Sequence, residues 1–359
     1  MTAALRYPPV YPYPYYQSRF FNGRQSAIEY LPADPRKVTV HSDNPLMRGR
    51  LLSDFDKINI ERCGVMLGEW LALPERQMLM NRSGVVVSIN YAWDCAPLPG
   101  RLWDTVNLPA FWDARAHLQA TWDTYPVVEH CAVMGHCYGR NYYHFTYETI
   151  QELRLFDAYD VRNLVVAPGL VGRAFQKDLF ERAGAGKILY GGNEVVRVVD
   201  PVVAQTYQSP TGVHWLRAVM GLETPPGKRR YYVRRTPEAF RKGNNISETP
   251  EFLALLARYG FETIDFGNGE NSIAQQVAMM RDAGVILAAH GAGLSNLGYL
   301  TAPLTVIEVF GRDVLSSSFL QLSVCLGFDY HAVLCDESDE MQCMVVDPQR
   351  LSAILDSAG

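Results

Sequence analysis

The chain has 359 residues, which at about 150 residues per domain predicts two domains. Hydrophobic residues make up 48% and charged residues 20%, a composition typical of a folded globular protein, and this excludes an intrinsically disordered chain. The net charge of −5 excludes a general electrostatic attraction to nucleic acid or anionic lipid, so a polyanion would have to bind at a local basic patch.

The cysteines and the N-terminal segment bear on the compartment. The chain has 7 cysteines, an odd and scattered set that lacks the density of a disulfide framework, which favours a reducing compartment. The N-terminus has no hydrophobic signal core, and no run of 18 apolar residues occurs. We therefore expect a soluble, cytoplasmic protein, with peripheral contact to the inner face of a membrane only if its substrate is lipid-linked.

The N-terminal half of the chain starts with a tyrosine- and proline-rich segment at residues 6–21, RYPPVYPYPYYQSRFF, which favours an extended arm. The arm would pack on its own domain or, alternatively, bind a partner as a proline-rich ligand. The alternating run VVVSINY at 85–91 predicts a strand. After residue 125, short apolar runs alternate with helical segments, which predicts a parallel sheet.

The second half predicts a doubly wound nucleotide-binding layer, because strand and helix patterns alternate from YYVRR to DYHAV. Turn signals at 208–230 indicate the connection between domains. We place an acceptor-side domain at 1–215 and a nucleotide-binding domain at 216–345. The final segment, 346–359, has helical spacing of its apolar residues and is expected to return to the first domain.

A glycine-rich turn, His290-Gly291-Ala292-Gly293-Leu294-Ser295-Asn296, follows a buried strand and opens a predicted helix. Its backbone amides and the helix N-terminus suit a diphosphate. The dinucleotide fingerprint fails, because its third glycine would fall at Asn296. Close packing of helix on strand is the alternative explanation for the glycines.

A basic segment reverses the overall negative charge, with Lys228, Arg229, Arg230, Arg234, Arg235, Arg241 and Lys242 falling close together. Because strand side chains alternate, only one of Arg234 and Arg235 can face a ligand crevice. We expect Arg235 and Arg241 to bind phosphate and the residues from Lys228 to Arg230 to form a solvated surface.

A third pattern lies in NYYHFTYE at 141–148, where Asn141, His144 and Glu148 share one face of a predicted helix. A carboxylate beside an imidazole can form a general base, and a buried, hydrogen-bonded histidine is the alternative. His130 and His136 raise the possibility of a metal site, but strand geometry separates the two His-Cys pairs by about 20 Å, so no metal is expected.

Residues from about 125 to 335 resemble glycosyltransferase family 61. The resemblance rests on NYYHFTYE, YYVRR, FRKGNN, HGAGLSN and VIEVF, in that order. It implies a two-domain GT-B fold in which two Rossmann-like domains face a cleft. It also implies an inverting, metal-independent transferase that moves a sugar from a nucleotide donor, expected to be UDP-linked, to a hydroxyl of a glycan or glycoconjugate. The family includes the capsular-polysaccharide transferases of bacteria.

The resemblance also implies roles for single residues. His144 or Glu148 would be the base, while Arg235, Arg241 and the amides from Gly291 to Leu294 would hold the diphosphate. Glu308 would accept ribose hydroxyls, or it is simply a charge at the end of a strand. The remaining substrate-binding candidates are Asn141, Arg234, Asn245 (or its neighbour Asn244), Gln276, His290 and Asn296. Two rival interpretations stay open, a nucleotide-binding hydrolase and a degenerate member that only binds glycan or protein.

Overall fold

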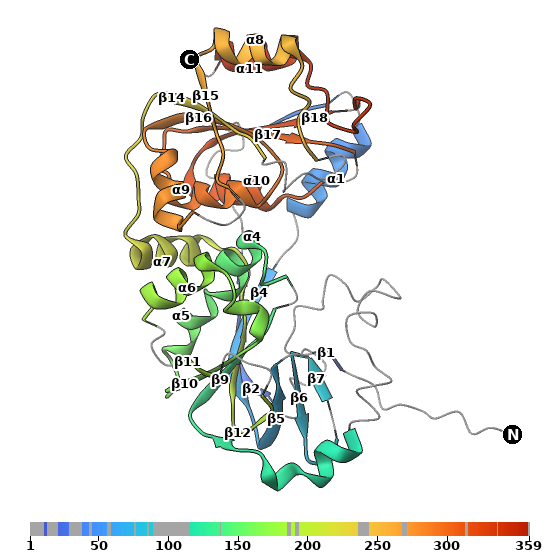
Figure 1. Cartoon of the computed structure of the whole chain (residues 1–359), viewed down its shortest axis with the longest axis vertical. Coiled ribbons are helices and arrows are strands. Elements are labelled where there is room, and N and C mark those ends of the chain that lie inside the picture. The colour runs from blue at the N-terminus through green and yellow to red at the C-terminus, as the bar shows by residue number, and fades with distance from the viewer. Residues whose placement is uncertain are drawn as a thin grey trace, which may run out of the picture. The chain divides into compact units, whose positions relative to one another are not determined.

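The computed structural model describes residues 11–12, 21–28, 38–42, 45–55, 59–74, 77–84, 86–88, 115–136, 138–184, 188–190, 194–235, 244–267, 271–312, 315–335 and 337–357 (Figure 1). Most of the tyrosine- and proline-rich arm lies outside these residues, as do Arg241 and Lys242. The strand expected at 85–91 is present as β7 (Val86–Ser88).

The chain divides into two compact units. Unit 1 contains Met1–Ala27 and Ile60–Tyr207, and unit 2 contains Ile28–Asn59 and Gln208–Gly359. The division after Tyr207 lies close to the predicted boundary at 215. The assignment of residues 28–59 to unit 2 was not predicted, and it follows from the pairing of β3 (Val38–His41) with β18 (Asp329–Leu334).

Unit 1 contains two sheets. The first sheet has the strand order β1 (Tyr11–Pro12), β7, β6 (Met78–Asn81), β5 (Glu69–Leu73), β12 (Val196–Val199), β8 (Val127–Val128). The second sheet has the strand order β11 (Ile188–Tyr190), β10 (Asn163–Val166), β9 (Cys131–Met134), β13 (Val202–Gln205), β4 (Asn59–Met66), β2 (Phe21–Ile28). Strands β9, β10, β11 and β13 pair in parallel, as the pattern after residue 125 predicts. Strands β5, β6 and β7 pair antiparallel.

Among the described residues of unit 1, the helices include a helical segment over 115–120, α4 (Tyr142–His144), the π-helix η5 (Phe145–Thr149), α5 (Glu152–Phe156) and α6 (Ala174–Arg182), with short 3-10 turns η4 (Trp122–Thr124) and η6 (Pro168–Leu170). A buried cluster joins residues of both sheets, among them Trp70, Val133, Val165 and Val198. Because the alternating residues of each strand point to opposite faces, one face of each sheet supplies this shared core.

Unit 2 is built on a parallel sheet with the order β15 (Phe261–Ile264), β14 (Arg229–Val233), β16 (Ala283–Ala289), β17 (Thr305–Phe310), β18, β3. Its helices are α1 (Pro45–Phe55), α7 (Pro210–Met220), α8 (Pro250–Arg258), α9 (Ile273–Met279), η8 (Ala292–Tyr299), α10 (Ser318–Leu326) and α11 (Pro348–Ser357). The chain passes from β14 to β15 on one side and then to β16 on the other. The order therefore reverses between β14 and β16, which is where doubly wound sheets bind ligands.

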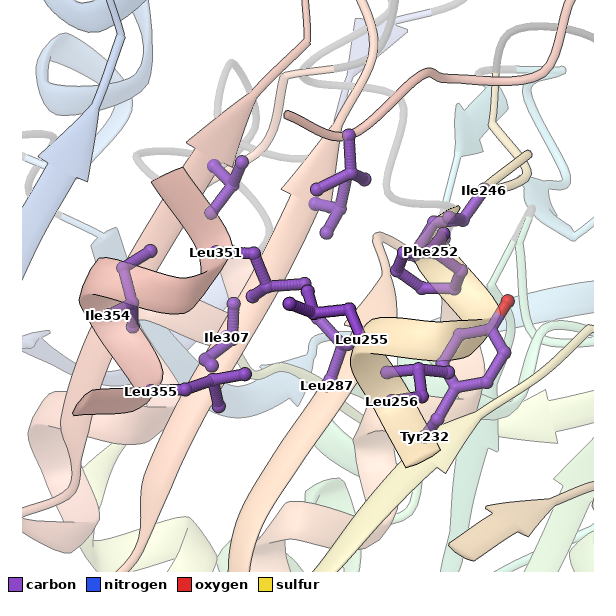
Figure 2. Packing of buried hydrophobic residues seen from close by; sticks show 14 of the residues in the cluster. Tyr232, Ile246, Phe252, Leu255, Leu256, Leu287, Ile307, Leu351, Ile354 and Leu355 are labelled. Atoms are coloured by element: carbon purple, nitrogen blue, oxygen red, sulfur yellow. The ribbon is translucent and has the colours of Figure 1, made fainter. Parts of the chain in front are cut away.

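Helices α8 and α11 cover one face of this sheet (Figure 2). Leu351, Ile354 and Leu355 of α11 are buried with Leu255 of α8 and Leu287 of β16. Each such side chain contributes about 1.5–3 kcal/mol through removal of apolar surface from water. Helix α11 therefore packs on unit 2, which corrects the prediction that it returns to the first domain.

The sequence and the structure agree on an α/β protein with parallel sheets. The GT-B arrangement of two facing domains stays a prediction. Among the described helices, none combines the length and the low polarity needed to cross a bilayer.

Candidate active site

His144 and Glu148 lie together at the start of a helix in unit 1. Asn141 caps this helix, because its Oδ1 accepts hydrogen bonds from the amides of Tyr143 (2.9 Å) and His144 (3.5 Å). The next turn is a π-turn, closed by the Ile150 amide on the Phe145 carbonyl at 2.8 Å. Turns of this kind are rare and occur frequently at functional sites. His144 Nδ1 lies 2.6 Å from Glu148 Oε2.

Of the predicted polar face, the structure brings His144 and Glu148 into contact. The third residue, Asn141, uses its side-chain oxygen to satisfy helix amides that would otherwise have no partner. This gives Asn141 a structural role, and its contact with substrate stays a prediction.

His136 joins this pair from the loop after β9. Its side chain is completely buried, and its Nε2 lies 3.2 Å from the same Glu148 oxygen. The Tyr138 amide donates to His136 Nδ1 at 3.1 Å. Because Nδ1 accepts this bond, we assign the imidazole proton to Nε2, which faces the carboxylate. We refer to His136, His144 and Glu148 as the unit 1 triad.

The electrostatics of the unit 1 triad favour an ionised carboxylate between two imidazoles. Burial by itself raises the pKa of Glu148, but hydrogen bonds from His136 and His144 outweigh it and bring this pKa to about 2. Burial lowers the pKa of His136, although the hydrogen bond to Glu148 opposes the shift. At neutral pH, Glu148 is thus ionised and His136 is neutral, with Nε2 of His136 3.2 Å from the carboxylate.

The ligand atoms of the unit 1 triad all lie within 4.8 Å of one another, close enough to hold a metal ion. A metal needs a lone pair on each ligand atom, yet His136 Nε2 carries the proton because its Nδ1 accepts the Tyr138 amide. Histidines that bind metals usually donate a hydrogen bond from the other ring nitrogen. The donor chemistry therefore favours a hydrogen-bonded relay, and the expected absence of a metal stays a prediction.

His144 is the most accessible member of the unit 1 triad. Its side chain is 31% exposed, compared with 12% for Glu148 and 0% for His136. Its Nε2 makes no hydrogen bond with any part of the chain that the structure describes. This nitrogen is the atom of the triad that a substrate can reach, and the exposed ring of Tyr138 lies beside it, with ring centroids 5.0 Å apart.

In unit 2, Arg235 and the glycine-rich turn meet where the strand order reverses. Arg235 follows β14 and His290 follows β16, and these two strands are hydrogen-bonded neighbours. The Arg235 guanidinium donates to the His290 carbonyl and lies directly over Gly291, where a Cβ atom would come within 2.0 Å of Arg235 Nη2. The absence of a side chain at residue 291 thus makes room for the guanidinium.

The neighbouring arginine points elsewhere, as strand alternation predicts. Arg234 is half-exposed and lies 3.7 Å from Glu248, in a surface ion pair. The phosphate contact of Arg234 stays a prediction. Arg241, the second predicted phosphate ligand, lies outside the described residues.

His290, Glu308 and Tyr330 form a second cluster beside the glycine-rich turn, and we call it the unit 2 cluster. His290 Nδ1 is 2.5 Å from Glu308 Oε1, and the Tyr330 hydroxyl donates to Glu308 Oε2 at 2.5 Å. Glu308 is completely buried, and both of its oxygens have protein partners. Glu308 thus positions His290, and its contact with ribose hydroxyls stays a prediction.

Two further predicted ligands are part of the core. Asn296 Nδ2 donates to Gln276 Oε1 at 2.9 Å, and Gln276 Nε2 donates to the Asn271 carbonyl at 3.0 Å. Both side chains are buried and together fasten η8 to α9. Both therefore have a structural role, and their contact with substrate stays a prediction.

The glycine-rich turn leads into η8, a 3-10 helix in place of the expected α-helix. The Leu294 amide donates to the Gly291 carbonyl at 2.9 Å, and the Leu294 side chain is buried. The amides of Gly291, Ala292 and Gly293 precede the first hydrogen bond within the helix. They are the ones left to bind an anion.

Asn245, the last predicted donor-site residue, is buried, and its carbonyl accepts the Met344 amide at 2.7 Å. Its Oδ1 has no hydrogen-bond partner within the described part of the chain, and the same holds for Asn244. A buried amide oxygen without a partner costs about 1–3 kcal/mol, so a ligand donor would be accommodated well at either residue.

Known proteins supply an independent comparison. Residues 142–307 match the Glycosyltransferase 61 family model. The match includes His144, Glu148, Arg235 and the glycine-rich turn, while His136 precedes it. It supports the resemblance to family 61 and a glycosyltransferase activity, without identifying a capsular subtype.

A curated relative is consistent with this family match. A segment of 104 residues is 28% identical to a Beta-1,2-xylosyltransferase of Arabidopsis thaliana. The aligned segment covers 29% of this chain and 19% of that protein, so the chain matches about a fifth of the relative's length. This similarity therefore agrees with the family 61 match and with sugar transfer. The donor and acceptor of the relative are properties of that protein and are not assigned to this chain.

The member of the site that sequence reasoning missed is His136. The sequence pattern suggests for it only a metal site shared with His130, whereas the structure places His130 in an exposed ion pair with Asp160 at 2.9 Å. A usable signal was present, because β9 ends at Met134 and His136 lies just beyond the carboxyl end of a parallel strand.

Proposed function

We propose that this protein is an inverting, metal-independent glycosyltransferase that moves a sugar from a nucleotide donor, expected to be UDP-linked, to a hydroxyl of a glycan or glycoconjugate. Unit 2 binds the donor and unit 1 activates the acceptor, and the GT-B organisation is part of this proposal. The main support is the meeting of Arg235 with the amides of Gly291 to Gly293 at the strand-order reversal of a parallel sheet.

On the donor side, sugar transfer breaks the bond between the anomeric carbon and the diphosphate, which leaves with a developing negative charge. Arg235 and the three free amides place a fixed positive field where this charge develops. A cation that is part of the protein chain thus does the work that magnesium does in other phosphate chemistry.

On the acceptor side, the hydroxyl oxygen attacks the anomeric carbon from the face opposite the diphosphate, and its proton must be removed. His144 Nε2 is the base in this proposal, because it is accessible and carries the ring's free lone pair. Glu148 accepts a hydrogen bond from His144 Nδ1–H at 2.6 Å. Its negative charge stabilises the imidazolium that forms when Nε2 takes the proton. A carboxyl group with a pKa of about 2 is itself a poor base at neutral pH, which separates the two roles.

Surface polysaccharide synthesis remains the proposed setting, with the resemblance to the capsular transferases as its support. The acceptor would then be a growing bacterial glycan, soluble or lipid-linked.

The first experiment combines a thermal-shift panel of nucleotides with mass-spectrometric detection of nucleotide released from a panel of nucleotide sugars. A ligand at 100 times its dissociation constant adds about 2.7 kcal/mol to the free energy of unfolding. This is enough to raise the melting temperature clearly. Release that depends on an added acceptor supports a transferase. Release without acceptor indicates the hydrolase, and the absence of any thermal shift indicates a binding module. Activity that vanishes on chelation and returns with manganese contradicts the metal-independent mechanism.

A further inference from the structure

Tyr138 presents an exposed aromatic ring next to the unit 1 triad, and the chemistry described so far does not use it. Of the large hydrophobic side chains that the structure describes, six are exposed, and Tyr138, at 44%, is the aromatic one among them. A single exposed apolar side chain needs no explanation by itself. The position of this one, beside the proposed base, does need one.

The turn that carries Tyr138 is held by hydrogen bonds on both sides. The Tyr138 amide donates to His136 Nδ1 at 3.1 Å, and its carbonyl accepts the Asn141 amide at 2.7 Å. The Gly139 amide donates to the His136 carbonyl at 3.0 Å, and the completely buried Gln176 donates from Nε2 to the Gly139 carbonyl at 2.7 Å. The backbone of the exposed residue is therefore fixed before any ligand arrives.

A fixed backbone makes Tyr138 a rigid contact surface. A tyrosine side chain has only two torsion angles, so it offers a large area to a ligand and loses little conformational entropy when the ligand binds. Binding energy is then not consumed in ordering the protein. Exposed and preorganised aromatic rings of this kind suit a ligand better than they suit a solvated surface.

The Tyr138 ring lies beside both imidazoles of the unit 1 triad. Its centroid is 5.0 Å from that of His144, with the two planes inclined by 33°, and 6.3 Å from that of His136. In the proposed reaction the acceptor hydroxyl must come within about 2.6–3.2 Å of His144 Nε2. A molecule that places a hydroxyl there also lies near the Tyr138 ring.

The chemistry of an aromatic face selects the kind of molecule that lies there. The face of the ring carries partial negative charge. A sugar ring gathers C–H bonds, which carry partial positive charge, on its flat faces, and it directs its hydroxyls outward from its edge. A sugar that lies on Tyr138 thus removes apolar surface from water and turns a hydroxyl toward His144. A serine or threonine hydroxyl in a peptide has no such flat face.

We propose that Tyr138 is the stacking platform for the acceptor, and that the acceptor is a saccharide whose C–H face lies on the phenol ring while one of its hydroxyls reaches His144 Nε2. The inference rests on the proposed function of unit 1, in which His144 is the base. Tyr138 binds and orients the sugar and exchanges no proton with it.

Saturation-transfer NMR on the full-length protein tests this assignment. The probes are methyl β-xyloside, methyl β-glucoside and methyl β-galactoside, with the tripeptide Gly-Ser-Gly as a hydroxyl compound that lacks a sugar ring. We expect at least one glycoside to receive saturation, most strongly on the C–H protons of one face of its ring, and the tripeptide to receive none.

Four variants assign the contact to the aromatic face. Tyr138→Phe keeps the face and should change the Kd of the bound glycoside less than twofold. Tyr138→Leu keeps apolar bulk without the ring, and Tyr138→Ala removes both, so each should raise this Kd about tenfold. Leu67→Ala is the matched control, because Leu67 is similarly exposed, at 49%, in the turn between β4 and β5. It should bind like the wild type.

The histidine ring signals show where the glycoside binds. In protein with isotope-labelled histidine, the glycoside should shift the ring signals of His144 and leave those of His130 unchanged, and His144→Gln assigns the signal. In Tyr138→Ala, unshifted signals of buried His136 in the absence of ligand verify that the turn is folded. UDP binding to the same variant should be unchanged.

Three results overturn the inference alone. They are a glycoside that binds Tyr138→Ala as well as the wild type, saturation of the tripeptide in place of the glycosides, and no saturation of any of the three glycosides. The proposed function fails on a different observation, which is the absence of nucleotide release that depends on an added acceptor. Stacking of a glycoside on Tyr138 without any such release would indicate a glycan-binding protein.

Discussion

His144 Nδ1 and Glu148 Oε2 lie 2.6 Å apart on consecutive turns of one helix, and the second of these turns is a π-turn. Residues four apart on a helix face each other, so the local sequence alone brings the imidazole to the carboxylate. His136 then approaches the same oxygen from the loop after β9. The hydrogen bond to Glu148 therefore holds His144 in the tautomer that carries its proton on Nδ1, which leaves Nε2 as the acceptor.

The first prediction concerns the roles of these two residues. His144→Ala should lower kcat by about 10²–10⁴-fold, the usual contribution of a general base, with the Kd for nucleotide unchanged. Glu148→Gln should lower kcat less, by about 10–100-fold, because the amide oxygen can still accept the Nδ1 proton while losing its charge. His130→Gln is the matched control, since His130 is an exposed histidine paired with Asp160. Equal loss of nucleotide binding and turnover in either variant contradicts these roles.

The second prediction concerns stability in acid. The pKa of His136 is lowered in the folded state, so the unfolded chain binds the additional proton, and stability falls as the pH drops below about 6.5. The pKa of Glu148 is lowered from 4.5 to about 2, so its contribution is present above pH 4.5 and is lost as the pH falls toward 2. Each group contributes a slope of up to about 1.4 kcal/mol per pH unit within its window.

Urea unfolding measured from pH 7.5 to 4.5 checks this prediction. His136→Gln should flatten the dependence of the free energy of unfolding on pH between 6.5 and 4.5, whereas His130→Gln should leave it unchanged. The comparison uses slopes, so a general loss of stability in the variant does not affect it. Identical slopes for wild type and His136→Gln would contradict the buried, neutral His136.

The third prediction concerns the contact between Arg235 and Gly291. Arg235→Ala should weaken nucleotide binding by about 10–100-fold, as expected for a hydrogen bond to a charged group. Gly291→Ala places a methyl group where the guanidinium lies, and because a long side chain can move aside, the protein should fold while binding falls by a similar factor.

The double variant tests whether these two changes act on one interaction. If they do, Arg235→Ala with Gly291→Ala should bind little worse than either single variant. Arg229→Ala is the control for charge, since Arg229 is exposed and paired with Glu262. Gly172→Ala is the control for the added methyl group, because a Cβ there meets nothing within 4 Å. Additive losses would place the two residues in separate sites.

The fourth prediction concerns helix α11. Leu351 is completely buried against α8 and the unit 2 sheet, so Leu351→Ala should lower the free energy of unfolding by about 2–5 kcal/mol. Ser352→Ala, the next residue on the same helix, should change it by less than about 0.5 kcal/mol. Chemical denaturation of both variants decides between a core helix and a dispensable tail, and similar stabilities would contradict the packing in Figure 2.

Local patterns of the sequence determined several features of this protein. Alternating strand and helix patterns predicted the parallel sheet of unit 2, because such periodicity depends on neighbouring residues only. Spacing on one helix predicted the meeting of His144 and Glu148. The positions of Arg235 and Gly291, each just after a strand, predicted that they share the end of the sheet, and the structure places them in contact.

Only the tertiary structure decided which polar residues remain available to a ligand. Glu308, Gln276 and Asn296 read as ligands in the sequence, but each is buried and bonded to a residue distant in sequence. Tertiary packing also decided three further features. It brings His136 to Glu148 from another element, pairs β3 with β18, and packs α11 on unit 2. These outcomes depend on which faces pack together, and packing is settled by burial across the whole unit, a quantity that no short segment contains.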